Sequence, residues 1–238
     1  MNTATGRSRL KKLLKTISYW LNYEKLCQKE SLFNEKYISY PIGQFLRSRF
    51  TKGLHTEFMH PYLKSKPTGS KPKIDFVVVE KIAQICKIKI AIETKWISGS
   101  PSLIKDIVRD VLRLALVAEH EDNATCYLIV VGKYNDWKNK IYNNKSFYRV
   151  TQRERKELLN LGSPGHSNFS PLNESKLFKN IVFEVAEKLD CKKKLPEQIR
   201  VTHYGMFPNN PSKNEYVALG WRIHTYKRNN IKENILPE

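Results

Sequence analysis

The sequence predicts an α/β protein with a mixed central β-sheet that is flanked by helices. Three apolar runs have the length of strands, at 74–79, 87–96 and 125–131. Between the last two, the segment 103–120 repeats apolar residues every three or four positions, which is typical of an amphipathic helix. With helical sequence before the first strands, the order helix, three strands, helix, strand favours a sheet with helices on both faces.

The charge of the chain narrows the classes of partner. The 238 residues include 42 Lys or Arg and 23 Asp or Glu, which gives a net charge of +19. Such a charge requires a polyanion, a membrane surface or an acidic partner. No apolar run approaches the roughly 18 residues of a membrane-spanning helix, and the N-terminus does not resemble a secretory signal. We therefore expect nucleic acid as the partner and no membrane.

Cysteine usage predicts the compartment. The four cysteines lie far apart, without a Cys-x-x-Cys pair. This pattern favours reduced thiols over a disulfide framework or a zinc site. A cytoplasmic, nucleoid-associated protein is the expectation that follows.

Residues 1–29 are expected to form a basic, helical N-terminal extension. Residues 1–20 contain no acid, and their apolar residues recur at helical spacing: Leu10, Leu13, Leu14 and Ile17. This helix could pack one face on the body, lie along a phosphate backbone or touch an anionic membrane. Helical sequence continues to about residue 50, with Pro41 predicted as the first residue of a restarted helix and Gly53 at the end of the helical region.

Three strands are predicted to follow. The segment 54–63 has strand character, and 64–73 is a turn that contains prolines, a glycine and four lysines. The strand 74–79 is apolar on both faces, as in the middle of a covered sheet. In 87–96, alternation places three isoleucines on one side, Ile88, Ile90 and Ile92. The opposite side of that strand carries Glu93 and Lys95.

The helix predicted at 103–120 begins with Ser100 or Ser102 as its N-cap. Asp106, Asp110 and Arg113 are spaced for ion pairs along its flank. Later elements are a helix at 172–189, strands at 199–207 and 216–224, and a polar tail at 226–238. Between them, 133–156 interleaves basic and aromatic residues, which suits a nucleic-acid groove and a solvated face about equally.

A group of charged residues lies at the ends of two predicted strands. Asp75 is the second residue of an apolar strand, where an unpaired carboxylate is costly and needs a cation, a basic side chain or a proton. If the strands are neighbours, Asp75 and Glu93 converge, and a cation between them would relieve their repulsion. Two carboxylates and a carbonyl suit Mg²⁺, and Lys95 could orient water or neutralise charge on a phosphate. These groups are sufficient for phosphodiester hydrolysis. The alternatives are that Asp75 forms a structural salt bridge and that Glu93 and Lys95 lie on a solvated strand face.

The context of this group makes it specific. Glu-x-Lys occurs at 93–95, 154–156 and 174–176, and Asp-x-Lys occurs at 136–138 and 190–192. Only the first ends an apolar alternating strand, 18 residues after an Asp within another apolar strand.

On these residues the chain resembles the PD-(D/E)xK, or restriction-endonuclease-like, nuclease superfamily. The motifs are PKID at 72–75 and IETKW at 92–96, and the order of elements agrees over about residues 30–132. The proline lies three residues before Asp75, whereas the family pattern has it directly before the acid. The resemblance implies Asp75 and Glu93 as metal ligands, the backbone carbonyl of Thr94 as a further ligand, and Lys95 as the catalytic lysine.

The resemblance also implies an activity and a domain plan. It implies a Mg²⁺-dependent or Mn²⁺-dependent DNA endonuclease of a restriction or phage-defence type, acting on double-stranded DNA and assembling as a homodimer. The nuclease domain would span 30–225, with its core at 30–132 and a basic, helical and strand elaboration at 133–225. A non-catalytic nucleic-acid-binding module is the alternative, and so is the same core acting on RNA or branched DNA.

Further site residues are predicted with less support from the motifs. Many members of the family place an acid on the first helix, and Glu35 is the candidate, with Glu57 as a rival and Glu30 as a weaker one. Basic residues of the turn and of the elaboration are expected to contact the phosphate backbone: Lys64, Lys66, Lys71, Lys73, Lys138, Lys140, Lys145 and Arg149.

Overall fold

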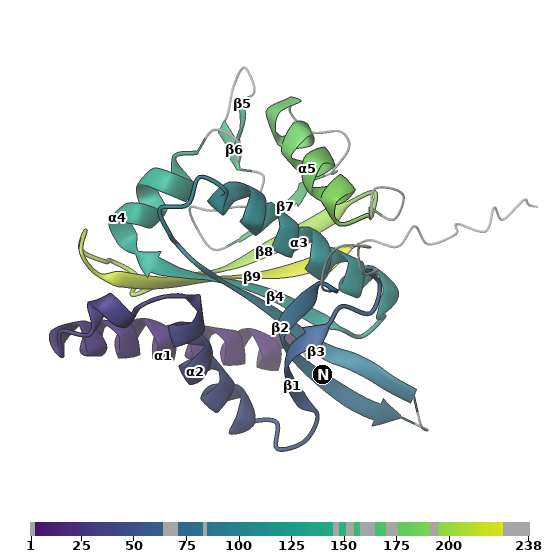
Figure 1. The fold of residues 1–238 in the computed structure, drawn as a ribbon, viewed down its shortest axis with the longest axis horizontal. Helices are drawn as coiled ribbons and strands as arrows, with labels where there is room; N and C mark the ends of the chain where they lie inside the picture. Colours follow the sequence, from purple (N-terminus) through teal and green to yellow (C-terminus); the bar gives the residue numbers. More distant parts are fainter. Residues whose placement is uncertain are drawn as a thin grey trace, which may run out of the picture.

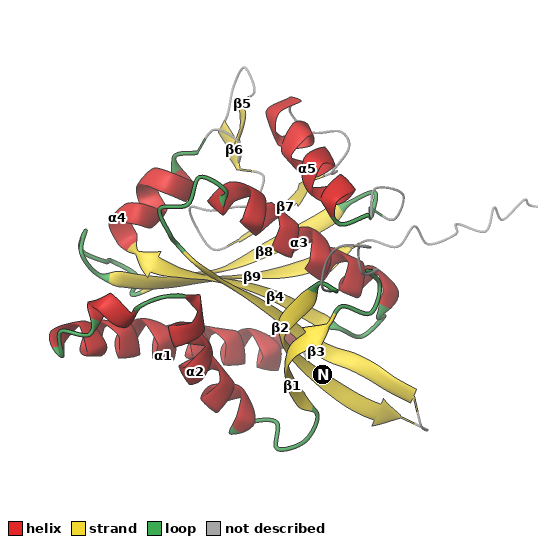
Figure 2. Cartoon of the chain, viewed as in Figure 1, coloured by secondary structure: helices red, strands yellow, loops and turns green. Residues whose placement is uncertain are grey.

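The computed structural model is a mixed α/β protein with one large sheet flanked by helices (Figures 1 and 2). It describes residues 3–63, 71–82, 85–144, 148–150, 155–157, 165–169, 176–190 and 195–225. Of the sequence predictions, Lys64, Lys66, Lys145 and the tail 226–238 lie outside this part, and only the backbone of Arg149 lies within it. Within the described residues, no helix has the length and apolar character needed to cross a bilayer.

The helices are α1 (Thr3–Leu26), η1 (Glu30–Leu32), α2 (Glu35–Arg47), α3 (Leu103–His120), α4 (Tyr134–Asp136), the π-helix η2 (Trp137–Tyr142) and α5 (Lys176–Lys188). The strands are β1 (Leu54–Met59), β2 (Lys73–Ile82), β3 (Ile85–Trp96), β4 (Thr125–Lys133), β5 (Tyr148–Val150), β6 (Arg155–Glu157), β7 (Gly165–Phe169), β8 (Ile199–Phe207) and β9 (Tyr216–Thr225).

Seven of the described strands form the large sheet, in the order β1-β2-β3-β4-β9-β8-β7, and β5 pairs with β6 separately. Only β3 and β4 run parallel in this sheet, and α3 connects them. All other neighbours in the sheet are antiparallel. The mixed sheet predicted from the sequence is therefore confirmed, and the two C-terminal strands extend it beyond β4.

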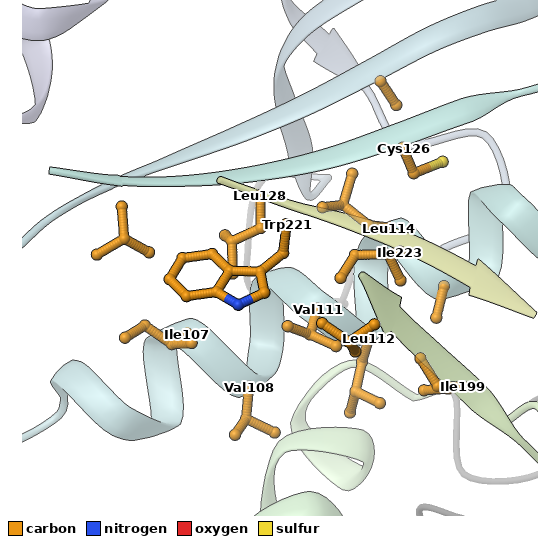
Figure 3. Packing of buried hydrophobic residues seen from close by; sticks show 14 of the residues in the cluster. Ile107, Val108, Val111, Leu112, Leu114, Cys126, Leu128, Ile199, Trp221 and Ile223 are labelled. Carbon is orange, nitrogen blue, oxygen red and sulfur yellow. The ribbon is translucent and has the colours of Figure 1, made fainter. Parts of the chain in front are cut away.

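Each face of the sheet has its own hydrophobic core. On one face, residues of α3 and α5 pack with alternate residues of β4, β8 and β9, and Figure 3 shows Trp221 among Ile107, Val111 and Leu128. On the other face, α1 and α2 pack on the opposite set of residues from β2, β3, β4 and β9. Because both faces are covered, the middle strands are apolar on both sides.

The N-terminal helix is part of the second core. Leu10, Leu13, Leu14 and Ile17 are all at most 3% exposed. Near the other end of the helix, Ser18 Oγ donates a hydrogen bond to the Tyr216 carbonyl of β9 over 3.1 Å. Of the three roles considered for this helix, packing one face on the body is the one observed.

Two local predictions are wrong. Pro41 does not begin a helix; it lies inside α2, where it is buried, and the helix continues past it to Arg47. In β3 the alternation of isoleucines breaks, because the register with β2 shifts between Val78 and Val79. Lys89 is the extra residue of this bulge, so Ile88 packs in the first core whereas Ile92 packs in the second.

The predicted ends of some elements also change. The strand predicted over 54–63 ends at Met59. Ser102 occupies the N-cap position of α3, but its side chain makes no capping bond and instead donates to Asp106 Oδ2 over 2.7 Å. The helix predicted from residue 172 is described from Lys176 onward.

Candidate active site

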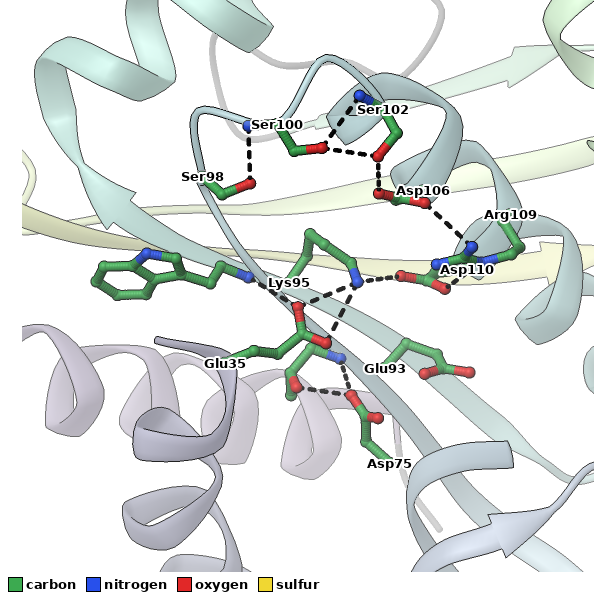
Figure 4. Close-up of polar contacts among 12 residues, drawn as sticks. Glu35, Asp75, Glu93, Lys95, Ser98, Ser100, Ser102, Asp106, Arg109 and Asp110 are labelled. Atoms are coloured by element: carbon green, nitrogen blue, oxygen red, sulfur yellow. Dashed lines mark hydrogen bonds and ion pairs between the residues drawn. The ribbon is translucent and has the colours of Figure 1, made fainter. Parts of the chain in front are cut away.

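The predicted motif residues come together where β2 and β3 separate. These strands are neighbours, and their last recorded pair on this side is Phe76 with Ile92. Asp75 and Glu93 are the next residue on each strand. Asp75 Oδ2 accepts hydrogen bonds from the Thr94 backbone N–H over 2.7 Å and from the Thr94 hydroxyl over 2.6 Å (Figure 4). Thr94 thus orients Asp75, which the sequence did not indicate, and the role of its carbonyl as a metal ligand stays a prediction.

Burial raises the pKa of Asp75 above its usual value. The two hydrogen bonds from Thr94 and the charge of Lys95 act in the other direction, whereas the Glu35 carboxylate adds to the increase. The ionised form of Asp75 is therefore stabilised by its neighbours only in part, and a further positive charge would stabilise it more.

Glu93 is almost fully enclosed, with 2% of its surface exposed. Burial and the nearby Asp110 carboxylate raise its pKa well above the usual value, and Asp75 contributes in the same direction. Arg113 Nη2 lies 3.0 Å from Glu93 Oε1, but the two are not aligned as a hydrogen bond, and Oε1 has no hydrogen-bond partner among the described residues. A buried carboxylate oxygen is thus left with a nearby charge and no donor.

Lys95 lies between two carboxylates (Figure 4). Its Nζ is 3.1 Å from Glu35 Oε2 and 3.2 Å from Asp110 Oδ2. Burial alone would lower the pKa of Lys95, but Asp110 and Glu35 outweigh it, and the pKa lies above its usual value. The amine is therefore a fixed ammonium at neutral pH, which suits charge neutralisation and does not suit proton abstraction.

The structure distinguishes the candidate acids by their position. Glu35 is the first residue of α2, and its Oε2 accepts hydrogen bonds from Lys95 Nζ and, over 3.4 Å, from the Trp96 N–H. Glu57 is exposed on β1, with its carboxylate 3.6 Å from the Lys73 ammonium. Glu30 accepts from the Tyr216 hydroxyl and pairs with Lys133. Glu35 is the one of these three that contacts a motif residue.

Two residues of α3 belong to the site although the sequence did not place them there. Asp110 and Arg113 form the predicted flank pair, with Arg113 Nη1 3.2 Å from Asp110 Oδ1. However, the same two side chains also reach Lys95 and Glu93 on β3. The sequence contained a signal for Asp110, because it lies three residues after Ile107 and so falls on the apolar side of the helix. In the structure Asp110 is 1% exposed.

The charges of this cluster do not balance. Three carboxylates of low exposure, those of Asp75, Glu93 and Asp110, lie with two enclosed cations, Lys95 and Arg113. The two more exposed charges of the cluster have opposite signs: the side chain of Glu35 is 44% exposed and that of Arg109, whose Nε lies 3.7 Å from Asp110 Oδ1, is 41% exposed. An excess of negative charge in a buried place favours uptake of a cation or a proton.

The side chains fit a divalent ion that takes few ligands from the protein. The described residues contain no group of three or more His, Cys, Asp or Glu side chains that could hold a metal. Mg²⁺ commonly takes one or two carboxylates and completes its shell with water and phosphate oxygens. Asp75 and Glu93 could supply two such carboxylates, because both bonds to Asp75 are made to one of its oxygens. Oε1 of Glu93 has no hydrogen-bond donor among the described residues, but it lies 3.0 Å from Arg113 Nη2.

The predicted phosphate-binding lysines have ordinary surface environments where they are described. Lys73 is exposed next to Glu57, and Lys140 pairs with Asp136 over 3.0 Å. Lys138 is exposed, and Lys71 is half-buried. None of the recorded contacts of these four joins them to the cluster, so their role stays a prediction.

Comparisons with known proteins give this chain no relative. No protein-family model matches it, and neither the search of curated proteins nor the search of solved structures finds a significant match.

Proposed function

We propose that this protein is a metal-dependent DNA endonuclease with a restriction-endonuclease-like core. The observation that carries the proposal is the position of half-buried Asp75 and buried Glu93 beside the Lys95 ammonium at the end of two adjacent strands. Burial near like charge disfavours their ionised forms, which is the electrostatic condition of a site that takes up a cation.

Asp75 and Glu93 would hold Mg²⁺ or Mn²⁺, with the Thr94 carbonyl as a further ligand. When bound, the ion would polarise the phosphodiester and lower the pKa of water. Thr94 fixes the direction of Asp75 through two short hydrogen bonds, and Arg113 provides the charge that favours ionised Glu93. The preorganised carboxylates limit the cost of reorganisation on binding.

Lys95 would neutralise the negative charge that grows on the phosphate in the transition state. Glu35 and Asp110 hold its ammonium from two sides, so the group is fixed before substrate arrives. The raised pKa of Lys95 keeps it protonated, which leaves proton abstraction from water to another acceptor.

The substrate in this proposal is double-stranded DNA in the cytoplasm, in a restriction or phage-defence role, with a homodimer cutting both strands. The net charge of +19 supports a polyanionic substrate. DNA binding through lysines and arginines would weaken steeply as salt is raised, because each neutralised phosphate releases counterions.

The test is a cleavage assay on plasmid and linear DNA with Mg²⁺ or Mn²⁺. We expect Asp75→Asn and Lys95→Met each to lower the cleavage rate by at least about 100-fold, since each removes a group of the charge-stabilising set. Asp106→Asn is the matched control, because Asp106 lies one turn before Asp110 and pairs with Arg109 at the surface. Equal cleavage by Asp75→Asn and the parent would refute the assignment.

The internal pairing of these charges also favours a second candidate, a non-catalytic nucleic-acid-binding module. In that case Lys95 and Glu93 are neutralised structurally by Asp110 and Arg113. This candidate predicts salt-sensitive DNA binding, no turnover with either metal, and no Mn²⁺ binding by titration calorimetry. Cleavage of RNA or of branched DNA in place of linear duplex would retain the nuclease and change its substrate.

A further inference from the structure

The outer sides of α1 and α2 carry exposed tyrosines and lysines. These helices cover one face of the sheet with their apolar residues (Figure 1), so their exposed rows lie on the opposite side of each helix. Lys15 reaches back from this row, with its ammonium 5.5 Å from the centroid of the Phe207 ring of β8. We define the outer helical face as these exposed residues: Lys12, Lys15, Tyr19 and Tyr23 on α1, and Lys36 and Tyr40 on α2.

The tyrosines are unusually exposed for aromatic side chains. Tyr19, Tyr23 and Tyr40 are 60%, 63% and 68% exposed. On α1 they continue a row that begins with the two lysines, at spacings of three and four residues that place them on one side of a helix. From Lys12 to Tyr23 this row extends about 16 Å, which is about the rise of five base pairs of DNA.

All acids near this face form internal bonds. Residues 8–50 contain three acids. Glu24 is buried and accepts from the Tyr37 hydroxyl over 2.6 Å, Glu30 pairs with Lys133 over 3.1 Å, and Glu35 contacts Lys95. The outer helical face itself therefore contains cations and phenol groups, and the two partly exposed acids beside it, Glu35 (44%) and Glu30 (39%), are each paired with a lysine.

The face also begins at the candidate active site. Glu35 is the first residue of α2 and contacts Lys95, and Lys36 is the next residue along the helix. A strand of nucleic acid that leaves the cluster along α2 would meet Lys36 and then Tyr40.

We propose that the outer helical face binds the phosphate backbone of the duplex DNA whose cleavage is proposed above. This inference rests on that proposed function for its substrate. Lysines neutralise phosphates, and phenol hydroxyls donate hydrogen bonds to phosphate oxygens. A second copy of the chain is a poorer occupant, because a two-fold interface brings the same surface of both copies together and would place these lysines near each other.

The experiment measures DNA binding without cleavage, by fluorescence anisotropy of a labelled duplex in EDTA across a salt series. The test variant is Lys12→Gln/Lys15→Gln/Lys36→Gln. Its control is Lys81→Gln/Lys87→Gln/Lys179→Gln, which removes the same charge from β2, β3 and α5, at lysines that, like those of the test variant, have no recorded ion pair among the described residues.

We expect the test variant to bind at least about tenfold more weakly at low salt. The slope of log K against log salt should become shallower by about 2.7, for three lost phosphate contacts. The control should keep the parent slope. Equal slopes and equal losses in both variants would overturn the proposal, because net charge alone would then explain the binding.

A second variant tests the tyrosines and the rival occupant. Tyr19→Ser/Tyr23→Ser should weaken DNA binding by about three- to tenfold while sedimentation shows the same oligomeric state as the parent. If instead the parent is a dimer, the variant is a monomer and the variant keeps full DNA affinity, then the face is an interface between copies and the proposal fails. A parent that binds DNA through this face and cuts nothing with Mg²⁺ or Mn²⁺ would refute the nuclease assignment alone.

Discussion

At the scale of residues, the notable feature is that the charges of β3 are paired with charges of α3. Arg113 forms an ion pair with Glu93, and Asp110 forms one with Lys95. Arg113 and Asp110 also pair with each other. Buried pairs of this kind contribute little net stability, yet removal of one partner is costly because the other charge remains in a nonpolar place. The network should therefore show strong coupling between its members.

Replacement of Arg113 by Met tests that coupling. We expect Arg113→Met to lower the free energy of unfolding by about 3–5 kcal/mol at pH 8, since it leaves buried Glu93 without its cation. Because the charge of Arg113 lowers the pKa of buried Glu93, its removal raises that pKa further, and the folded variant keeps a proton there to a higher pH than the folded parent. The deficit should thus grow as the pH rises above the already raised pKa of Glu93 in the parent and shrink below it. Urea unfolding monitored by circular dichroism at several pH values measures this.

Two further variants control the experiment. Arg113→Met/Glu93→Gln should recover much of the lost stability, because the double variant removes the uncompensated charge. Arg109→Met, on the same helix but 41% exposed, should cost less than about 1 kcal/mol. Equal costs for Arg113→Met and Arg109→Met would show that Glu93 does not depend on Arg113.

The site could be predicted from sequence only where strand pattern decides it. Asp75, Glu93 and Lys95 were predictable because charged residues are unusual in apolar strands. Asp75 lies within such a strand, and Glu93 and Lys95 lie at the end of another. Asp110 and Arg113 had an ordinary explanation as a helix pair at a spacing of three residues. Their second set of partners depends on how α3 packs on β3, and helix periodicity alone does not determine that packing.

At the scale of elements, local pattern predicted most helices and strands, and packing decided the exceptions. Pro41 is compatible with the interior of α2 because the helix is held by its buried side, including Ile38 and Ile42, although proline lacks the N–H that would bond to residue 37. The bulge at Lys89 likewise depends on the pairing partner in β2. Neither constraint is readable from the segment by itself.

The contact between α1 and β9 illustrates such a constraint and gives a test. A Cβ added at Gly220 would lie 2.8 Å from Leu14 Cδ1 and 3.3 Å from Leu10 Cδ2, and both leucines are buried. Gly220→Ala should lower the free energy of unfolding by about 1–3 kcal/mol, since α1 or its leucines must shift. The denaturation midpoint at an unchanged m-value measures this.

Gly99→Ala is the control for that substitution. Its added Cβ would meet nothing within 4 Å, so its stability should stay within about 0.5 kcal/mol of the parent. If Gly220→Ala behaves like Gly99→Ala, then α1 does not lie as close to β9 as its leucines indicate.

At the scale of the whole molecule, His60 joins the edge strand to the central helix and makes global stability depend on pH. It is fully buried just after β1. Its Nδ1 accepts from the Tyr62 N–H over 3.2 Å, and its Nε2 lies 2.9 Å from the Arg113 carbonyl of α3. This arrangement suits the neutral ring with its proton on Nε2, because a second proton on Nδ1 would displace the Tyr62 bond.

Burial lowers the pKa of His60 to about 4, and the charge of Arg113 adds to the decrease while the bond to its carbonyl opposes it. Between that value and the usual 6.5, the unfolded chain binds a proton at this residue and the folded chain does not. Stability is therefore full above 6.5 and falls as the pH is lowered towards 4, by about 3 kcal/mol for this group. Asp75, Glu93 and Asp110 act in the opposite sense, because their raised pKa values favour folding at lower pH. The pH dependence of the parent's unfolding free energy therefore combines both effects.

The difference in unfolding free energy between the parent and His60→Gln isolates the contribution of the histidine. This difference should change by about 3 kcal/mol between pH 7 and pH 4. A constant difference across that range would show that the protonation of His60 is not coupled to unfolding.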